Sequence, residues 1–515
     1  MLWGKLIDHD RCIGCHACSV ACKSEHRVPL GVFRTWVKQV EKGRGQATRR
    51  HFGVLRCNQC DRPPCVAICP TAAMHQRTDG IVDFDRALCV GCKACIQACP
   101  YDAIYIDPET HTAAKCNFCA HRVEEGLVPA CVAACPTDAL LVSDLEDPES
   151  PVARAVAREG AVVRKPELGT QPKVFYKGAD ASVLDPHAAR PLHPGMWGAS
   201  RAPEADATPA PRRGAPAAAR VAYDVPRERG PWGARISLYL FAKGIGAGAL
   251  MVGGLALLLR GPEALGQVPP LLGLLGLLAT LLLLVSDLER PDRFLLVLFR
   301  PQPRSWLVRG AWVLSAAVAL AAAWLAALSL GPVAPWVRTA LGVGGIVLGA
   351  AAAGYTALLF GQARGRLLWQ SPLLLPHLVV QAFLAGASSL AVVPGLVDAG
   401  VPSEAYWTGR LLSLGALMAP LLGLNVACIL GELWIHGTED ARLAVRWMQR
   451  GPQGTTLTYG VFILGHIFPA VALAFAFIAP DGFAAGVGLA GVAALCGLFL
   501  WDDLYLRAGQ VPPLS

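Results

Sequence analysis

Cysteines carry the clearest chemical signal in this sequence. Sixteen of the eighteen cysteines lie between residues 12 and 135, in four groups of four. Groups one and three share the spacing C-x2-C-x2-C-x3-C, group two has a longer middle gap, and group four has eleven residues between its second and third members. A proline follows the last cysteine of groups two, three and four. In chain order the groups are Cys12, Cys15, Cys18 and Cys22; Cys57, Cys60, Cys65 and Cys69; Cys89, Cys92, Cys95 and Cys99; and Cys116, Cys119, Cys131 and Cys135.

This spacing is typical of ferredoxin-type [4Fe–4S] clusters. Three cysteines spaced two apart wrap around three corners of one cluster, and the fourth, at the start of a helix, reaches the other cluster of a pair. A structural zinc site needs four ligands but no trailing C-x3-C-P. Disulphides would not repeat one spacing through the chain. The sequence therefore predicts iron–sulphur clusters.

Sixteen thiolates, at four per cluster, predict four [4Fe–4S] clusters. The spacing alone leaves open which groups are partners. Groups two and three lie close together and could form an inner unit, with groups one and four closing around it. This nested hypothesis gives the ligand sets Cys12/Cys15/Cys18/Cys135, Cys22/Cys116/Cys119/Cys131, Cys57/Cys60/Cys65/Cys99 and Cys69/Cys89/Cys92/Cys95.

Length and composition indicate a chain of two or three domains with a membrane-embedded half. The chain has 515 residues, of which 54% are hydrophobic, a share too high for a soluble protein. The net charge of +8 does not indicate nucleic-acid binding, because most arginines lie beside apolar segments. Met1–Asp10 is short and mixed in character, so we expect no export signal. Sixteen reduced thiols also fit assembly in a reducing compartment.

Residues 1–180 are predicted to form an α+β, ferredoxin-like iron–sulphur domain. Short strands are expected near Leu2–Asp8, Gly80–Phe84, Ala103–Asp107 and Val174–Tyr176.

Two further segments of this half have less certain roles. The basic segment Val28–His51 fits either a solvated loop or a docking surface for a partner subunit. Residues 181–235, rich in Pro, Ala and Arg, show no helical or strand periodicity and are predicted to be a linker. That linker could reach far, or it could pack along the cluster domain as an extended strap.

From Ile236 onward the sequence predicts an all-α polytopic membrane bundle of eight helices, within a domain of residues 236–515. Each apolar run has about the 20 residues that cross a hydrocarbon core of about 30 Å. Glycine and alanine are frequent in the runs, as expected where helices pack closely in lipid. The runs lie near 236–259, 268–286, 310–330, 336–361, 373–394, 411–431, 458–479 and 483–501.

Arginines gather on one side of the predicted bundle. That side holds eleven arginines of the loops and the C-terminal end, among them Arg290, Arg364 and Arg442, whereas the other side has three. The positive-inside rule then places both termini and the cluster domain in the cytoplasm, beneath the inner membrane. Some of these arginines could instead dock the cluster domain.

Polar side chains inside the apolar runs are the candidate quinone-binding residues. Charged groups in lipid are costly, so each is either functional or a buried partner that ties two helices together. A quinone needs hydrogen-bond donors to its carbonyls and a proton route, which Tyr, His, Lys and Asp or Glu supply. A bis-histidine haem would have only His377 and His466 available, and no haem is expected. The candidates are Tyr239, Lys243, Asp287, Tyr355, His377, Gln381 and Glu432.

Residues 1 to about 180 resemble the four-cluster electron-transfer subunit of molybdopterin oxidoreductases, such as polysulphide and dimethyl sulphoxide reductases. The resemblance rests on the four cysteine groups and implies the nested pairing given above. In some relatives the second cysteine of group three is Trp and one cluster has three irons. Here that residue is Cys92, so the resemblance implies four [4Fe–4S] clusters.

Residues 236–501 resemble the NrfD/polysulphide reductase membrane subunit. The matching stretches are Ser286–Trp312 and Tyr355–Pro376. The resemblance implies eight helices, no haem and a quinone site, with Tyr355 matching the tyrosine of that site. The family's other quinone contacts, near the first helix, have no clear match. The fusion of two subunits in one chain departs from the family pattern.

Together these features predict an electron-transfer and quinone-reactive membrane subunit without substrate chemistry of its own. Electrons would pass between a catalytic partner, expected to be molybdopterin-dependent, and the quinone pool in the membrane. Two alternatives are the electron-transfer subunit of a hydrogenase and a redox-driven proton-translocating module.

Overall fold

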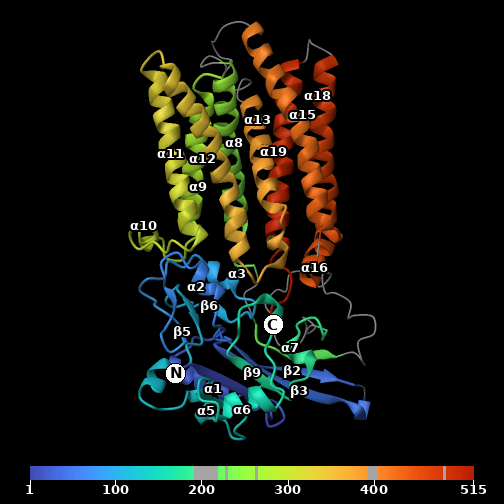
Figure 1. The fold of residues 1–515 in the computed structure, drawn as a ribbon. Coiled ribbons are helices and arrows are strands. Elements are labelled where there is room, and N and C mark those ends of the chain that lie inside the picture. The colour runs from blue at the N-terminus through green and yellow to red at the C-terminus, as the bar shows by residue number, and fades with distance from the viewer. Residues whose placement is uncertain are drawn as a thin grey trace.

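The computed structural model describes residues 1–43, 45–190, 219–226, 230–260, 265–392, 404–435, 437–478 and 483–515. An α/β domain of short strands and helices lies against one end of a bundle of long helices (Figure 1). Both chain termini lie on the side of the bundle that carries this N-terminal domain (Figure 1).

The described part of the N-terminal domain contains four small sheets. Two of them have three strands each, in the orders β8-β1-β9 and β10-β2-β3, and two are the hairpins β4-β5 and β6-β7. Strand β1 pairs antiparallel with β8 and parallel with β9, so both ends of the domain's sequence meet in one sheet. The strands are β1 (Trp3–Asp8), β2 (Thr35–Lys42), β3 (Arg49–Arg56), β4 (Met74–Gln76), β5 (Val82–Phe84), β6 (Ile104–Ile106), β7 (Ala113–Lys115), β8 (Leu140–Asp144), β9 (Val174–Lys177) and β10 (Arg220–Tyr223).

Among the residues that the structure describes, seven short α-helices belong to this domain, and four of them carry cysteines. Proline opens α2 and α6 at the first helical turn, where its missing N–H costs nothing. The Ser150 side chain accepts a hydrogen bond from the amide of Ala153 and thereby caps α6. The helices are α1 (Ala17–His26), α2 (Pro64–Ile68), α3 (Ala94–Ala98), α4 (Ala120–Glu124), α5 (Ala130–Ala133), α6 (Pro151–Arg158) and α7 (Ala181–Leu184).

Two segments are more ordered than the sequence analysis predicts. The interpretation of Val28–His51 as a solvated loop is wrong, because β2 and β3 form a regular antiparallel hairpin whose Val37 and Val54 face each other in the core. The predicted linker contributes β10, which pairs with β2, so residues 220–223 pack along the domain as a strap. Local periodicity does not reveal this strand, because its partner lies far away in sequence. Linker residues 191–218 and 227–229 lie outside the described residues.

The eight predicted membrane helices are confirmed within the described residues. Each is long and apolar enough to cross a bilayer. The seventh span is continuous but changes character, from α17 (Gly451–Thr455) through a π-helix (Thr456–Ile467) to α18 (Phe468–Ile478). The other spans are α8 (Ala234–Arg260), α9 (Val268–Ser286), α11 (Trp306–Ser329), α12 (Pro335–Gln362), α13 (Leu374–Val392), α15 (Glu404–Trp434) and α19 (Phe483–Ala508).

Helices α8 and α13 cross at glycines, at the centre of the bundle. A Cβ atom added to Gly248 would overlap the carbonyl oxygen of Ala382, and one added to Gly386 would overlap the carbonyl carbon of Gly248. Small residues therefore let the two backbones touch, which is how helices associate in lipid. The α8 and α13 backbones are therefore in direct contact at Gly248 and Gly386.

The loops between spans form the interface with the N-terminal domain. The Arg366 guanidinium donates to the Gln97 side chain at 2.6 Å and to the Gln510 carbonyl at 3.3 Å. Arg293 donates to the carbonyl of Arg86, and Ser305 donates to the carbonyl of Ile68. Several loop arginines therefore dock the N-terminal domain, the second role considered for them above. Two short helices, α10 (Leu296–Phe299) and α16 (Glu439–Met448), lie on the same side (Figure 1).

Candidate functional site: four thiol sets and a buried polar group

The structure brings thiols of different cysteine groups close together in the N-terminal domain. The Cys22 thiol lies within electrostatic range of Cys116, Cys119 and Cys131. Short helices position these residues, since Cys22 lies on α1 and Cys131 on α5. Cys22, the fourth cysteine of group one, therefore lies close to the thiols of group four.

The other three sets have the same crossed pattern. Neighbouring thiols are Cys12 with Cys15, Cys18 and Cys135; Cys60 with Cys57, Cys65 and Cys99; and Cys95 with Cys69, Cys89 and Cys92. The thiols Cys69, Cys89, Cys92 and Cys95 also line one cavity. These neighbours agree with the nested hypothesis. Three further pairs, Cys18 with Cys131, Cys57 with Cys116 and Cys65 with Cys95, are neighbours from different proposed sets.

The loops of groups one and three share a left-handed backbone conformation on either side of their second cysteine. Gly14 and Gly91 adopt φ values of 68° and 69°, and His16 and Lys93 adopt 63° and 61°. These left-handed residues flank Cys15 and Cys92, and each loop then enters a helix, α1 or α3. Glycine takes this conformation without strain. The repeated geometry explains why the same spacing recurs in both groups.

The surroundings of the thiols fit iron–sulphur clusters. Backbone amides of Met74, Ala113 and Ala139 donate to the sulphurs of Cys69, Cys89 and Cys135 at 3.4, 3.3 and 3.3 Å. Such hydrogen bonds stabilise thiolate ligands and tune a cluster. Within the described residues, no group of three or more His, Cys, Asp or Glu is compact enough for a single metal ion. A cluster holds its four thiolates further apart than a single ion would.

Positive charge concentrates beside Cys131. The Arg56 guanidinium donates to the Cys131 sulphur at 3.1 Å, and the Lys5 ammonium donates to it at 3.6 Å. Burial alone would raise the pKa of Cys131, but Arg56 and Lys5 lower that pKa to about 6. For Cys22 and Cys119, burial is the main effect and raises the pKa of the thiol, in the case of Cys119 to about 11.

The four sets run from an exposed end of the domain to the bundle. Cys15 is exposed, and its set lies near α1 and α5, at the end far from the bundle (Figure 1). Cys92 lies at the bundle, where its carbonyl accepts a hydrogen bond from the Trp232 indole at 3.3 Å. Lys93 forms an ion pair with Glu289 at 2.9 Å, which fixes the loop after α9 against group three.

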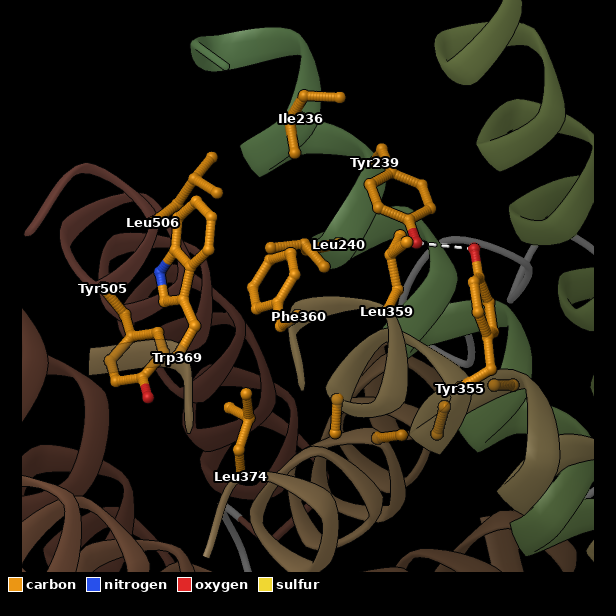
Figure 2. Close-up of a cluster of buried hydrophobic side chains, with 14 of the residues drawn as sticks. Ile236, Tyr239, Leu240, Tyr355, Leu359, Phe360, Trp369, Leu374, Tyr505 and Leu506 are labelled. Carbon is orange, nitrogen blue, oxygen red and sulfur yellow. Dashed lines mark hydrogen bonds between the residues drawn. The ribbon is translucent and has the colours of Figure 1, made fainter. Parts of the chain in front are cut away.

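An aromatic stack continues from Cys92 into the bundle. Trp232 stacks on Trp369 and on Phe360, with ring centroids 5.6 and 6.0 Å apart, and the latter two stack at 4.5 Å. Figure 2 shows Phe360 and Trp369 on one side of Leu240 and Leu359, with Tyr239 and Tyr355 on the other. The stack thus separates the thiol set of group three from a buried polar group.

This buried polar group joins α8 to α12. The hydroxyls of Tyr239 and Tyr355 hydrogen-bond at 2.5 Å (Figure 2). The Tyr239 hydroxyl also hydrogen-bonds the Thr356 hydroxyl at 2.8 Å. The Lys243 ammonium donates to the carbonyl of Ala353 at 3.0 Å and to the Thr356 hydroxyl, and it lies 5.1 Å from the centre of the Tyr355 ring. An ammonium and two phenols thus converge inside the membrane span.

A cavity adjoins this polar group on the side of α13 and α19. Lys243, Gln381 and Asp502 all line it, among apolar side chains. The Gln381 amide donates to the Asp502 carboxylate at 2.7 Å. The sequence analysis does not predict Asp502, because the predicted eighth run ends at Trp501. It does not predict Thr356 either, because an uncharged threonine within an apolar run gives no clear signal. Asp502 could have been identified from the sequence as a carboxylate that directly follows an apolar run.

The remaining candidates lie apart from the two tyrosines. Asp287 follows α9 near Lys93 and Arg235, where burial raises the pKa of its carboxyl group. Glu432, near the end of α15, accepts a hydrogen bond from the Tyr505 hydroxyl at 3.2 Å. Neither ring nitrogen of His377 has a hydrogen-bond partner among the described residues, although Asn425 lies close by.

Comparisons with protein families match both halves of the chain. Residues 225–513 match the family described as polysulphide reductase, NrfD. Residues 49–145 match a 4Fe-4S dicluster domain, and residues 3–24 match a 4Fe-4S binding domain. The N-terminal domain is thus an iron–sulphur domain, and the bundle is of the NrfD type.

Individual relatives are subunits of reductases. The sequence is 47% identical over 200 residues to a subunit of the tetrathionate reductase of Salmonella typhimurium, covering 38% of this chain and 79% of that protein. It is 44% identical over 176 residues to a polypeptide of the polysulfide reductase of Wolinella succinogenes, covering 34% of this chain and 92% of that protein. It is 36% identical over 207 residues to a subunit of the selenate reductase of Mesobacillus selenatarsenatis, covering 34% of this chain and 71% of that protein.

Proposed function

Since the protein belongs to the polysulphide reductase NrfD family and binds iron–sulphur clusters, we propose that it links the quinone pool to a catalytic subunit. It is the electron-transfer and membrane-anchor subunit of a reductase complex. The observation that carries this proposal is the aromatic stack of Trp232, Phe360 and Trp369, which begins at the Cys92 carbonyl and lies across Leu240 and Leu359 from the Tyr239–Tyr355 pair.

Four [4Fe–4S] clusters are proposed, one for each thiol set. Each bound cluster supplies one-electron transfer. The neighbours of Cys22 and Cys99 support four clusters, because each of these cysteines lies close to a thiol of a different cysteine group, as the nested ligand sets require. The protein's own part is to hold thiolates, donate amide hydrogen bonds to their sulphurs and exclude water.

The quinone site is proposed at Tyr239, Tyr355 and Lys243. Two phenol hydroxyls and an ammonium can donate hydrogen bonds to a quinone carbonyl in a water-poor site, where such bonds are strong. Asp502 lines the adjoining cavity and can hold and pass the protons that quinone reduction consumes, while the Gln381 amide hydrogen-bonds its carboxylate. Of the seven candidates, Asp287, His377 and Glu432 lie outside this proposed site.

The catalytic partner is proposed to be molybdopterin-dependent and to dock at the exposed end near Cys15. Ile13, Val20 and Leu30 are exposed there by 58%, 65% and 92%, which suits a protein interface. The relatives' names, which include tetrathionate, polysulfide and selenate reductase, favour a reductase over a hydrogenase as partner. We place the N-terminal domain on the cytoplasmic side of the inner membrane, from the arginine asymmetry of the loops.

A second candidate function is redox-driven proton translocation. Its support is a second buried polar group, in which the Asn425 amide and the His466 ring hydrogen-bond at 2.9 Å. The neighbouring His377 has no hydrogen-bond partner for its ring nitrogens among the described residues. Buried polar groups of this kind in lipid mark proton routes or helix ties. Asn425→Leu in vesicles separates the two, because only a proton route would lose proton movement while quinone reduction continued.

The experiment that tests the proposed function uses the full chain in lipid nanodiscs. Iron analysis should give about sixteen irons per chain, that is, four for each of four clusters. After reduction with dithionite and removal of the excess, a short-chain quinone should reoxidise the clusters, as seen by absorbance and EPR. About eight irons per chain, or clusters that stay reduced with quinone present, would contradict the proposal.

A further inference from the structure

Arg56 is a buried cation among the predicted ligand thiols. It ends β3 directly before Cys57, and its side chain is only 1% exposed. One terminal nitrogen donates to the Cys131 sulphur at 3.1 Å. The strongest electrostatic neighbours of the guanidinium are the thiols of Cys131, Cys116 and Cys18 rather than a carboxylate.

Most of the hydrogen-bonding capacity of this guanidinium has no partner in the protein. Its Nε and its second terminal nitrogen make no hydrogen bond to any described residue. A buried charge without a counter-charge is strongly destabilising. The thiolates of the neighbouring sets supply the negative charge that balances Arg56 at this place.

The thiol set beside the membrane has different surroundings. The strongest electrostatic neighbours of Cys92 and Cys95 are other thiols. The nearby Lys93 is already paired with Glu289. Positive charge is therefore distributed unevenly along the four sets, and Arg56 lies at the junction of the two sets that contain Cys18 and Cys131.

We propose that Arg56 raises the reduction potential of the cluster held by Cys22, Cys116, Cys119 and Cys131. Reduction adds one electron to a cluster and makes it more negative, without a bond or proton being moved. A fixed positive charge in contact with a ligand sulphur stabilises that reduced form. Arg56 thereby favours electrons on this cluster over the cluster beside the membrane. This inference rests on the four ligand sets of the proposed function.

The test is a potentiometric EPR titration of the purified full chain with dithionite and mediators. Cys131→Ser first identifies the EPR signal of the cluster concerned. In Arg56→Gln, the midpoint of that signal should fall by at least 59 mV, a tenfold change in its one-electron equilibrium. Arg56→Lys, which keeps the charge, should shift it by less. Arg164→Gln, which removes a similarly buried guanidinium that donates to the carbonyls of Leu184 and Leu514, should leave it unchanged.

Each outcome bears on one claim. If Arg56→Gln loads its iron fully and the Cys131-sensitive signal keeps its midpoint, the inference is wrong while the proposed function stands. If Arg56→Gln loses that cluster and Arg56→Lys retains it, the charge is needed and the inference is supported. Loss in both variants would show a packing role and overturn it. If Cys131→Ser changes no signal, the ligand sets themselves are wrong.

Discussion

At the scale of single residues, Cys99 tests how the thiols are divided among the sets. Its motif neighbours are Cys92 and Cys95, but its strongest thiol neighbour is Cys57. Cys99→Ser should therefore damage the cluster of Cys57, Cys60 and Cys65. EPR of the reduced protein would record this as the loss or conversion of one signal.

The control for this prediction is a cysteine outside the sets. Cys496 is exposed on the last span, so Cys496→Ser should keep every signal and the full iron content. Damage to the signal that Cys92→Ser also removes would mean that each motif keeps its own fourth cysteine, and the nested sets would be abandoned.

The residues of the candidate sites differ in how far the sequence predicts them. Cysteine types and spacing predicted the thiol groups, since each loop is local. Tyr355 and Lys243 were candidates because polar groups are rare in apolar runs. Arg56, Trp232 and Asp502 were not predicted, because each matters through a contact with a residue more than 70 positions away. Such contacts leave no local pattern.

At the scale of elements, the contact between α8 and α13 depends on glycine. Gly386→Leu should destabilise the bundle by about 1–3 kcal/mol, because the new side chain would strike the α8 backbone at Gly248. A lower midpoint of thermal unfolding in detergent would show this. Gly423 on α15 is exposed and would meet no atom within 4 Å, so Gly423→Leu is the matched control. Equal stability of the two variants would contradict the close packing.

The sequence predicts the helices of the bundle more completely than the strands and helices of the N-terminal domain. Runs of about 20 apolar residues indicate membrane helices without knowledge of their partners. The π-helix Thr456–Ile467 was not predicted, since its residues are as apolar as those of an α-helix. The strap strand β10 depends on β2, about 180 residues earlier. The four residues of β10 do not predict a strand unless its pairing with β2 is known.

At the scale of the whole molecule, an ion pair between His187 and Asp440 ties the N-terminal domain to α16. Burial would lower the pKa of His187, but the hydrogen bond to Asp440 and the charges of Asp185 and Glu439 raise it. A raised pKa in the folded state gives stability that is present below the ordinary histidine pKa. That stability is lost as the pH rises through the raised value.

Hydrogen exchange of the α16 amides, corrected for the intrinsic pH effect, should therefore show less protection at pH 8 than at pH 5.5. His187→Gln should remove this difference, whereas His75→Gln in β4 should keep it. Protection that is independent of pH in the wild type would show that the ion pair does not hold the domains together.

The most direct test of electron transfer from thiol sets to quinone is the rate at which quinone reoxidises reduced clusters in Tyr355→Phe. Loss of one hydrogen bond in a buried site costs about 1–3 kcal/mol, or roughly ten- to a hundredfold in quinone affinity. Tyr459→Phe is the control, because Tyr459 is 62% exposed on the seventh span. We predict that Tyr355→Phe keeps its iron and its membrane insertion but reoxidises its clusters at least tenfold more slowly at limiting quinone. Wild-type reoxidation by Tyr355→Phe would contradict the account and place the quinone elsewhere in the bundle.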